Sequence, residues 1–372
     1  MATIDEIILR HSRRGMPLLA QHLPAGACQR AAEALLACPR GLVTLITGFP
    51  VGPAAETDGP PGTYFLGLGL QQLGFQVLVA TDRLCRGFFD HEPGLAAEYL
   101  PLEREAAVRA CQAFLQERNP VALVAVERCG RDATGTYRNM HGHDISSRTA
   151  PLDELFLQAA PETLTIGIGD GGNEIGMGGL RDVIRSELKL SPCVVPADHL
   201  LVATVSSCGA LGLLACLGQL TGRQLLPGAT AHRAFLEHIV SRGAVAAPRG
   251  EPALEVDGFD LSVELDILES LEEASMTLEP PLDLPPEVHH PGYHIRRMRM
   301  PHCARGPERC TACQETPEEV CLLQLHPPGS GLAARPIIQV GDDPRWWEYE
   351  ILGTFDSQAE AESYLHQLPG TS

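Results

Sequence analysis

The stretch Leu42–Thr47 (LVTLIT), closed by Gly48-Phe49-Pro50, decides the fold class. Its residues are apolar or β-branched, and it ends at a glycine and a proline, which is typical of a buried strand. Similar runs alternate with helical patterns along the chain. The predicted strands are 42–47, 76–81, 121–127, 163–169 and 200–205, and the predicted helices are 3–14, 27–37, 63–73, 102–117, 181–188, 206–220 and 231–241. This alternation predicts an α/β fold with a mostly parallel sheet and helices on both faces.

The alternation stops at the proline-rich stretch Leu278–Pro291, which predicts a linker. Beyond it the pattern indicates two strands, 336–340 and 346–354, and a helix over 357–367. We therefore predict a small α+β C-terminal appendage. The expected division is a catalytic α/β domain over residues 1–277, a linker over 278–300 and a cysteine-containing ββα-like appendage over 301–372.

Charge and hydropathy exclude several classes of partner. Lys and Arg number 28 and Asp and Glu 47, so the net charge of −19 predicts a surface that repels nucleic acid and anionic lipid. No apolar run reaches the roughly 18–20 residues that a membrane span needs. The first residues include Asp5 and Glu6 where a signal peptide would be positive, so we expect a cytoplasmic protein.

The sequence also argues against three common cofactors. The chain has a single lysine, Lys189, and no Gly-Lys-Ser/Thr motif, so no ATP-binding P-loop is expected. Because Lys189 ends a predicted helix, a pyridoxal phosphate Schiff base is not expected either. Glycines 167, 169 and 172 match G-x-G-x-x-G, but the motif overlaps a predicted strand and its acids would face a pyrophosphate, which disfavours NAD.

Polar residues collect where the predicted strands end. Ligands of open α/β sheets bind beyond the carboxyl ends of the strands, so five such loops would form one rim. The richest is Gly167–Gly179 (GIGDGGNEIGMGG), with seven glycines in thirteen residues. Glycine lets the backbone approach a ligand, and Asp170, Asn173 and Glu174 offer the oxygen ligands that Mg²⁺ and Mn²⁺ prefer. The alternative interpretation is a tight turn with solvated acids.

Two other strand ends carry candidate residues. Glu56 and Asp58 lie in the rigid loop Glu56–Gly62 (ETDGPPG), whose alternative interpretation is a proline turn with exposed acids. Glu127-Arg128 ends a predicted strand, where an ion pair is the alternative. Arg128 and Arg138 could hold carboxylates through bidentate hydrogen bonds.

These motifs together resemble the D-glutamate cyclase family. The resemblance covers residues 3–260 and rests on four runs: 56–62, 127–130, 137–145 and, as the most specific, 167–178. It implies an α/β hydro-lyase of the stand-alone form that converts a small substrate, D-glutamate, into 5-oxo-D-proline and water. Some animal members are mitochondrial, so a eukaryotic chain would be expected in the matrix.

The implied reaction joins an amine to a carboxylate carbon. It requires a base, an acid and a positively charged group beside the carboxylate that offsets its negative charge. We predict Asp58, Glu127, Asp170 and Glu174 as catalytic residues, with Asp170 and Glu174 as ligands of Mn²⁺ or Mg²⁺. The roles within this group stay open. The predicted substrate-binding residues are Glu56, Arg128, Arg138, Gly171, Gly172, Asn173 and Ser206.

Two departures from the family pattern bear on substrate choice. The chain has Ser206-Ser207-Cys208-Gly209 where a run of the type Ser-Asn-Trp-Gly is expected, and Ala246 where an aspartate is expected. If these positions line the pocket, the substrate would differ. Two rival hypotheses are a non-catalytic binder of an acidic amino acid or its lactam, and another metal-dependent enzyme acting on a small carboxylate. Each hypothesis leaves open whether the protein forms a homo-oligomer.

Four cysteines cluster near the C-terminus: Cys303, Cys310, Cys313 and Cys321. Cys310-x-x-Cys313 has metal-ligand spacing, but the flanking spacings match no common zinc pattern. A structural Zn²⁺, free thiols and a redox pair are the alternatives.

Overall fold

The computed structural model describes residues 2–276, 293–299, 318–324, 335–338 and 348–355. The chain falls into two compact units, residues 1–281 and 282–372, and each is described by itself. None of the described helices is both long and apolar enough to cross a membrane.

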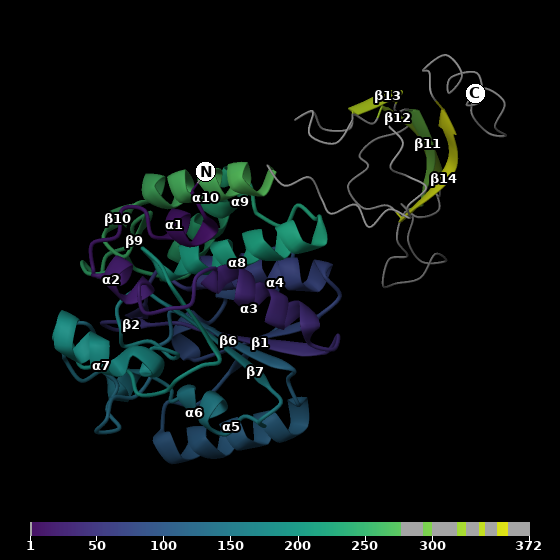
Figure 1. The fold of residues 1–372 in the computed structure, drawn as a ribbon. Helices are drawn as coiled ribbons and strands as arrows, with labels where there is room; N and C mark the ends of the chain where they lie inside the picture. Colours follow the sequence, from purple (N-terminus) through teal and green to yellow (C-terminus); the bar gives the residue numbers. More distant parts are fainter. Residues whose placement is uncertain (1, 277–292, 300–317, 325–334, 339–347, 356–372) are drawn as a thin grey trace. The chain divides into compact units, whose positions relative to one another are not determined.

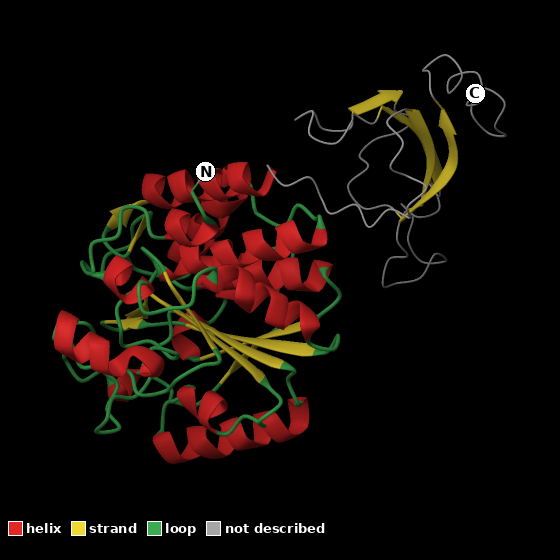
Figure 2. Ribbon diagram, viewed as in Figure 1, coloured by secondary structure: helices red, strands yellow, loops and turns green. Residues whose placement is uncertain are grey.

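The first unit is built on a six-stranded, wholly parallel sheet (Figures 1 and 2). From edge to edge its strands are β5 (Ala97–Tyr99), β4 (Gln76–Thr81), β1 (Leu42–Thr47), β6 (Ala122–Val126), β7 (Leu164–Gly169) and β8 (His199–Val202). In chain order this is 3-2-1-4-5-6, the order of the doubly wound fold, and the predicted α/β class is confirmed. The direction of winding reverses between β1 and β6, where Leu45 pairs with Val124. Ligands bind at such a switch point.

Helices cover both faces of the sheet. One face carries α3 (Ala27–Ala37), α4 (Pro60–Gln72) and α8 (Ser206–Thr221), with α1 (Ile4–Ile8), α9 (Ala229–Ser241) and α10 (Leu261–Met276) outside them (Figure 1). The other face carries α5 (Arg104–Arg118) and α6 (Asp153–Leu157), and its core also takes in α2 (Met16–Ala20) and the end of α7 (Arg181–Val183). Helix α8 is buried from Ser206 to Gly218 because it lies between the sheet and α1, α3 and α10, which explains its apolar sequence.

Several element boundaries differ from the sequence prediction. The capping box of Thr3 and Glu6 is present, but α1 ends at Ile8 instead of residue 14, because the chain turns and His11 adopts a φ of 65°. The strand predicted over 200–205 ends at Val202. The short edge strand β5 and the whole of α10 were missed. The early end of α1 matters most, because residues 9–15 then form a loop instead of further helical turns.

The second unit contains an antiparallel four-stranded sheet in the order β13-β12-β11-β14. Its strands are β11 (Tyr293–Arg299), β12 (Glu318–Gln324), β13 (Arg335–Ile338) and β14 (Glu348–Phe355). Strand β11 lies in the segment predicted as linker. Its sequence, YHIRRMR, interrupts the apolar alternation at Arg296-Arg297, and the pairing with β14 shifts register between Ile295 and Arg296. The predicted helix 357–367 lies outside the described residues.

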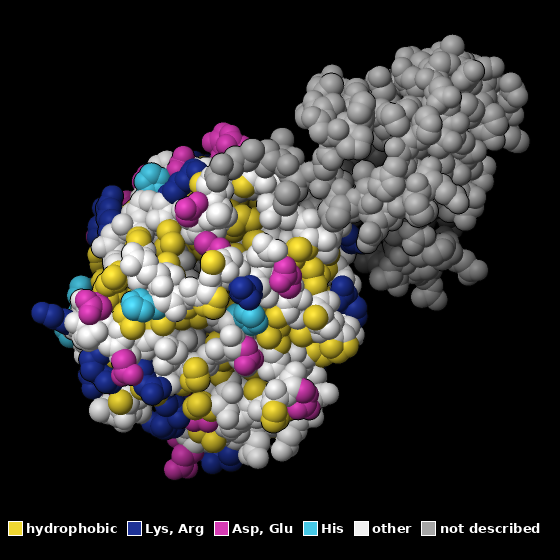
Figure 3. Space-filling view, in the orientation of Figure 1, with side chains coloured by type: hydrophobic (Ala, Val, Ile, Leu, Met, Phe, Trp, Pro, Cys, Tyr) yellow, Lys and Arg dark blue, Asp and Glu magenta, His cyan; other side chains and the backbone are white. Residues whose placement is uncertain are grey.

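The surface does not spread the acidic excess evenly. On the face shown in Figure 3, arginine and lysine side chains gather on one side of the first unit, near α7, although the whole chain carries a charge of −19. The predicted repulsion of nucleic acid rests on the total charge and stays a prediction.

Gly62 allows α4 to cross close to the start of α8. A Cβ at Gly62 would lie 2.7 Å from Ser207 Cα and 2.8 Å from Ser207 O, and these backbone atoms have little room to move. We expect Gly62→Ala to lower the free energy of unfolding by about 3 kcal/mol, as overpacking does. Urea unfolding measures this. Gly228→Ala, where an added Cβ meets nothing within 4 Å, is the control, and equal stability of both variants would contradict the close crossing.

Candidate functional site

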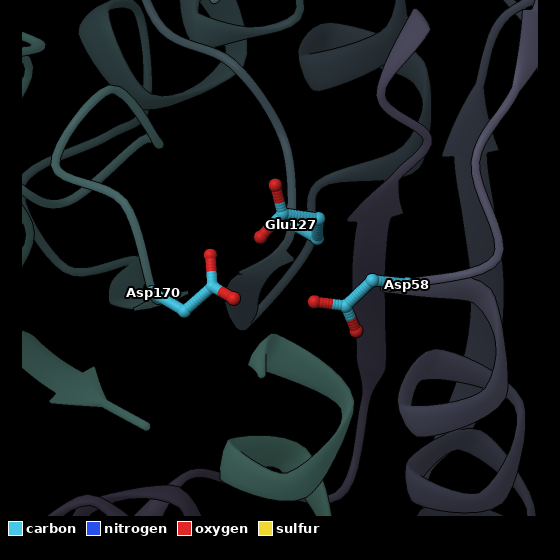
Figure 4. A group of neighbouring side chains, drawn as sticks. All are labelled: Asp58, Glu127 and Asp170. Carbon is cyan, nitrogen blue, oxygen red and sulfur yellow. The ribbon is translucent and has the colours of Figure 1, made fainter. Parts of the chain in front are cut away.

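Three buried carboxylates meet at the carboxyl ends of the central strands. Asp58 follows β1, Glu127 follows β6 and Asp170 follows β7, and one oxygen of each lies within 4.8 Å of the others (Figure 4). Their residues are only 1%, 6% and 1% exposed, respectively. The predicted convergence of these strand ends is therefore observed, at the switch point of the sheet. We call these three residues the carboxylate cluster.

Asp58 holds the cluster to the start of α8. Its Oδ2 accepts the N–H of Ser206 at 2.8 Å, and its Oδ1 accepts the N–H of Ser207 at 2.9 Å. Oδ1 also accepts the N–H of Gly59 at 2.7 Å. The N-cap residue of α8, Val205, has no side-chain cap, so a carboxylate from a distant segment takes its place. Burial and then Asp257 raise the pKa of Asp58 to about 6, against the effect of these N–H donors.

Glu127 points into the cluster because its backbone is unusual. It is the first residue after β6 and has a φ of 46°, a conformation that costs a non-glycine residue energy and often marks a functional site. The Ser206 hydroxyl donates to Glu127 Oε2 at 2.5 Å. Burial, and then Glu174 and Glu56, raise the pKa of Glu127 well above its usual range. The surroundings of Glu127 therefore favour its protonated form.

Asp170 stands at the start of the glycine-rich turn, which folds around Glu174. Glu174 Oε1 accepts the N–H groups of Asp170 and Gly171, at 3.1 and 2.6 Å, and Oε2 accepts that of Gly172 at 2.7 Å. The Glu174 carboxylate thus orders its own turn, and it is not one of the cluster residues. Burial, then Asp257 and Glu127, raise the pKa of Asp170 well above its usual range.

Glu56, a predicted substrate-binding residue, lies close enough to the cluster for Asp58 to affect its pKa. It is 4% exposed, and burial raises its pKa well above the usual range, with Asp257 and Asp58 adding to the effect. Its backbone pairs with Val245, which joins the loop after β1 to the segment that precedes the β9–β10 hairpin (Glu255–Val256 and Phe259–Asp260). Glu56 is thus a further acid of the same site.

The sequence analysis missed Arg14 and Asp257. Arg14 lies in the loop between α1 and α2, and its Nη1 is 3.4 Å from both carboxylate oxygens of Asp170. Asp257, at the turn of the β9–β10 hairpin, forms an ion pair with Arg14. Burial alone would lower the pKa of Arg14, but Asp170 and Asp257 raise it well above its usual value. Asp257-Gly258 was a readable turn signal, but nothing in the sequence placed it beside Asp170.

The other predicted substrate-binding residues have partners within the protein. Arg128 is fully buried and donates to Asp82 Oδ2 at 2.8 Å and to Ala150 O at 2.7 Å. Arg138 donates to Asp132 Oδ2 at 2.7 Å, and its carbonyl accepts from Asn173 Nδ2 at 2.8 Å. The structure does not bring these side chains into the cluster. They tie together the loops that carry it.

The two departures from the family pattern are also buried. Ser207 Oγ accepts the N–H of Gly59 at 3.0 Å, so it supports the loop of Asp58. Cys208 and Ala246 are fully buried. Of the four C-terminal cysteines, Cys303, Cys310 and Cys313 lie outside the described residues, and only the backbone of Cys321, in β12, is described. The zinc hypothesis stays a prediction.

The carboxylate cluster fits a hard divalent cation. Ligand oxygens bound to Mg²⁺ or Mn²⁺ at about 2.1 Å lie roughly 3–4 Å from one another, and the three cluster oxygens are within 4.8 Å. Like charges this close favour either protonation or a cation. The ligand set would then be Asp58, Glu127 and Asp170. Of the predicted pair, Asp170 belongs to it, whereas the oxygens of Glu174 are engaged with the turn.

A further buried acid, Glu264, lies in the core within electrostatic reach of Asp58. Glu264 of α10 and His232 of α9 face each other in the core, with His232 Nε2 3.9 Å from Glu264 Oε1. Burial, and then the charge of Asp58, raise the pKa of Glu264 well above its usual range. Burial lowers the pKa of His232 to about 4. Burial therefore favours the uncharged form of both side chains in the folded protein.

This buried acid predicts a stability that falls with rising pH. Glu264 keeps its proton when folded but loses it above about pH 4.5 when unfolded, so the folded state binds more protons. Stability should fall by up to about 1.4 kcal/mol per pH unit through this group. Glu264→Gln should remove the effect, so its advantage in melting temperature should grow from pH 5 to pH 8. Glu269→Gln, exposed on the same helix, is the control. A difference independent of pH would contradict the assignment.

Comparisons with known proteins agree on one family. A family model described as D-glutamate cyclase-like, C-terminal, matches residues 4–272. A human protein named D-glutamate cyclase, mitochondrial, is 35% identical over 198 residues, which cover 47% of this chain and 32% of that protein. The chain therefore spans about a third of the length of that relative.

Proposed function

The chain belongs to the D-glutamate cyclase-like family, and from this membership we propose that it converts D-glutamate into 5-oxo-D-proline and water. The observation that carries the proposal is the carboxylate cluster, because it combines buried acids of raised pKa with a fit to a divalent cation. The human relative bears the name of this activity. The family model matches residues 4–272, a range that includes all three cluster residues.

The reaction needs proton transfer rather than a net supply of acid or base. The substrate ammonium group loses two protons as its nitrogen bonds to the γ-carboxyl carbon, and one carboxyl oxygen takes two protons and leaves as water. A side chain near both atoms can accept a proton from nitrogen and pass one to oxygen. Such a group works best when its pKa is close to the operating pH.

We assign this transfer to Glu127. Its pKa is raised by burial, and its carboxyl group is held by the Ser206 hydroxyl at 2.5 Å. Asp58 and Asp170 flank it and would hold a divalent ion, with Glu127 as a third ligand only when it has passed its proton on. Such an ion would supply Lewis acidity toward the γ-carboxylate and offset its negative charge. Glu174 positions Asp170 through the turn that it orders.

A direct assay tests the proposal. Purified protein is incubated with D-glutamate or L-glutamate, with Mn²⁺, Mg²⁺ or a chelator, and 5-oxoproline is followed by chiral chromatography against a protein-free blank. We expect 5-oxo-D-proline from D-glutamate in the presence of metal. Stabilisation of the protein by D-glutamate without product would favour the non-catalytic binder. Absence of both would move the search to another small carboxylate.

A further inference from the structure

Arg14 brings positive charge to the carboxylate cluster from the solvent side. Its side chain is 21% exposed, whereas those of Asp170 and Asp257 are 1% and 6% exposed. Two other arginines near these loops, Arg128 and Arg138, are already paired with Asp82 and Asp132. A ligand that reaches the cluster from solvent would therefore meet the guanidinium group of Arg14.

The contact between Arg14 and Asp170 is long. Both oxygens of Asp170 are 3.4 Å from Nη1, whereas a charge-assisted hydrogen bond measures about 2.7–2.9 Å. Nη1 and Nη2 each contact one carboxylate oxygen of Asp257, and Nη2 also lies 3.4 Å from the Asp257 carbonyl oxygen. A guanidinium group has five planar N–H donors, of which the Asp257 carboxylate takes one on each terminal nitrogen, so others remain for a second carboxylate. Arg14 can therefore accept a substrate carboxylate while it keeps its ion pair with Asp257.

The proposed substrate needs such a partner. D-Glutamate carries two carboxylates, of which the γ-carboxylate reacts and the α-carboxylate is retained in the product. Among Glu56, the cluster residues and Asp257, an α-carboxylate would meet like charges unless a cation balances it. Resting on the proposed function, we propose that Arg14 binds the non-reacting α-carboxylate and thereby selects substrates with two carboxylates.

The local backbone holds Arg14 in this place. Helix α1 ends early, and the loop is anchored where the Thr204 N–H donates to Ile8 O at 2.8 Å. Gly15 then adopts a φ of 81°, and an added Cβ there would lie 2.4 Å from Leu188 Cδ2. Asp257, with a φ of 53°, is fixed by its hairpin and acts as a positioning residue for Arg14.

The test compares two substrates that differ only in the α-carboxylate, D-glutamate and 4-aminobutyrate. For Arg14→Gln we expect kcat/KM for D-glutamate to fall about 100-fold, the scale of one charge-assisted pair, with little change for 4-aminobutyrate. The preference of the wild type for D-glutamate should therefore collapse. Arg14→Lys should recover part of it. The matched control is Arg13→Gln, because Arg13 stacks on Phe259 and its loss changes the net charge equally.

The outcomes separate this proposal from the proposed function. Equal losses on both substrates, or an unchanged preference, would overturn the role of Arg14 while leaving the cyclase activity in place. If the wild type does not turn over D-glutamate, the proposed function fails. The role of Arg14 is then tested by calorimetry, which compares the binding of 5-oxo-D-proline with that of 2-pyrrolidinone. Wild-type preference for 5-oxo-D-proline that Arg14→Gln abolishes would support it, and no such preference would overturn it.

Discussion

Asp170→Asn should reduce the turnover of D-glutamate by about a thousandfold or more and leave the protein at least as stable as the wild type. The exchange keeps the shape of the side chain but removes one charge from three oxygens that lie within 4.8 Å of one another. Losing a metal ligand or a preorganised charge in a buried site costs turnover on this scale. Because burial, Asp257 and Glu127 disfavour the charge at Asp170, its removal relieves repulsion in the folded state.

Steady-state kinetics with saturating Mn²⁺ and thermal melting check both parts of this expectation. Asp182→Asn, an exposed position on α7 that changes the charge equally, is the control and should behave like the wild type. Turnover of Asp170→Asn at the wild-type rate would remove Asp170 from the catalytic site. A large loss of stability would instead show that its charge supports the fold.

Asp58→Asn should lower both turnover and stability, the latter by about 2–4 kcal/mol. The two oxygens of Asp58 accept three backbone N–H groups, from Gly59, Ser206 and Ser207. Asparagine offers one acceptor oxygen, and its NH₂ group would face a backbone donor, so at least one buried N–H loses its partner. The charge that favours the start of α8 is lost as well.

Urea unfolding of the two variants side by side separates their roles. Asp58→Asn should unfold at a lower urea concentration than the wild type, and Asp170→Asn should not. Should Asp58→Asn unfold like the wild type, the attachment of α8 through this carboxylate would be wrong. The same Asp182→Asn variant controls for net charge.

Most of the sheet was predictable because each strand is a continuous apolar or β-branched run. Strands β1 and β4 and helix α3 have the predicted bounds, and the parallel order follows from the helices between strands. The short edge strand β5 was not predictable, because its three residues, AEY, form no such run. Convergence of the acids after β1, β6 and β7 followed from the general rule for open α/β sheets.

The orientation of individual side chains could not be predicted. Glu127 and Arg128 are adjacent, yet one joins the cluster and the other binds Asp82. The reason is the positive φ of Glu127, which a glutamate in the sequence does not indicate. Glu174 was assigned to the metal because its oxygens suit one, but it is taken up by its own turn. Arg14 and Asp257 come from segments 243 residues apart, so only the folded chain joins them.

The attachment of α8 through Asp58 has a consequence for how this family can diverge. A descendant that no longer needed the proposed reaction could replace Asp170 without harm to folding, but replacing Asp58 would loosen a helix that packs against α1, α3, α4 and α10. Selection for a folded protein alone would therefore retain Asp58. Among relatives, a retained Asp58 therefore indicates only that the fold is kept. A retained Asp170 is the better indication that catalysis is still under selection.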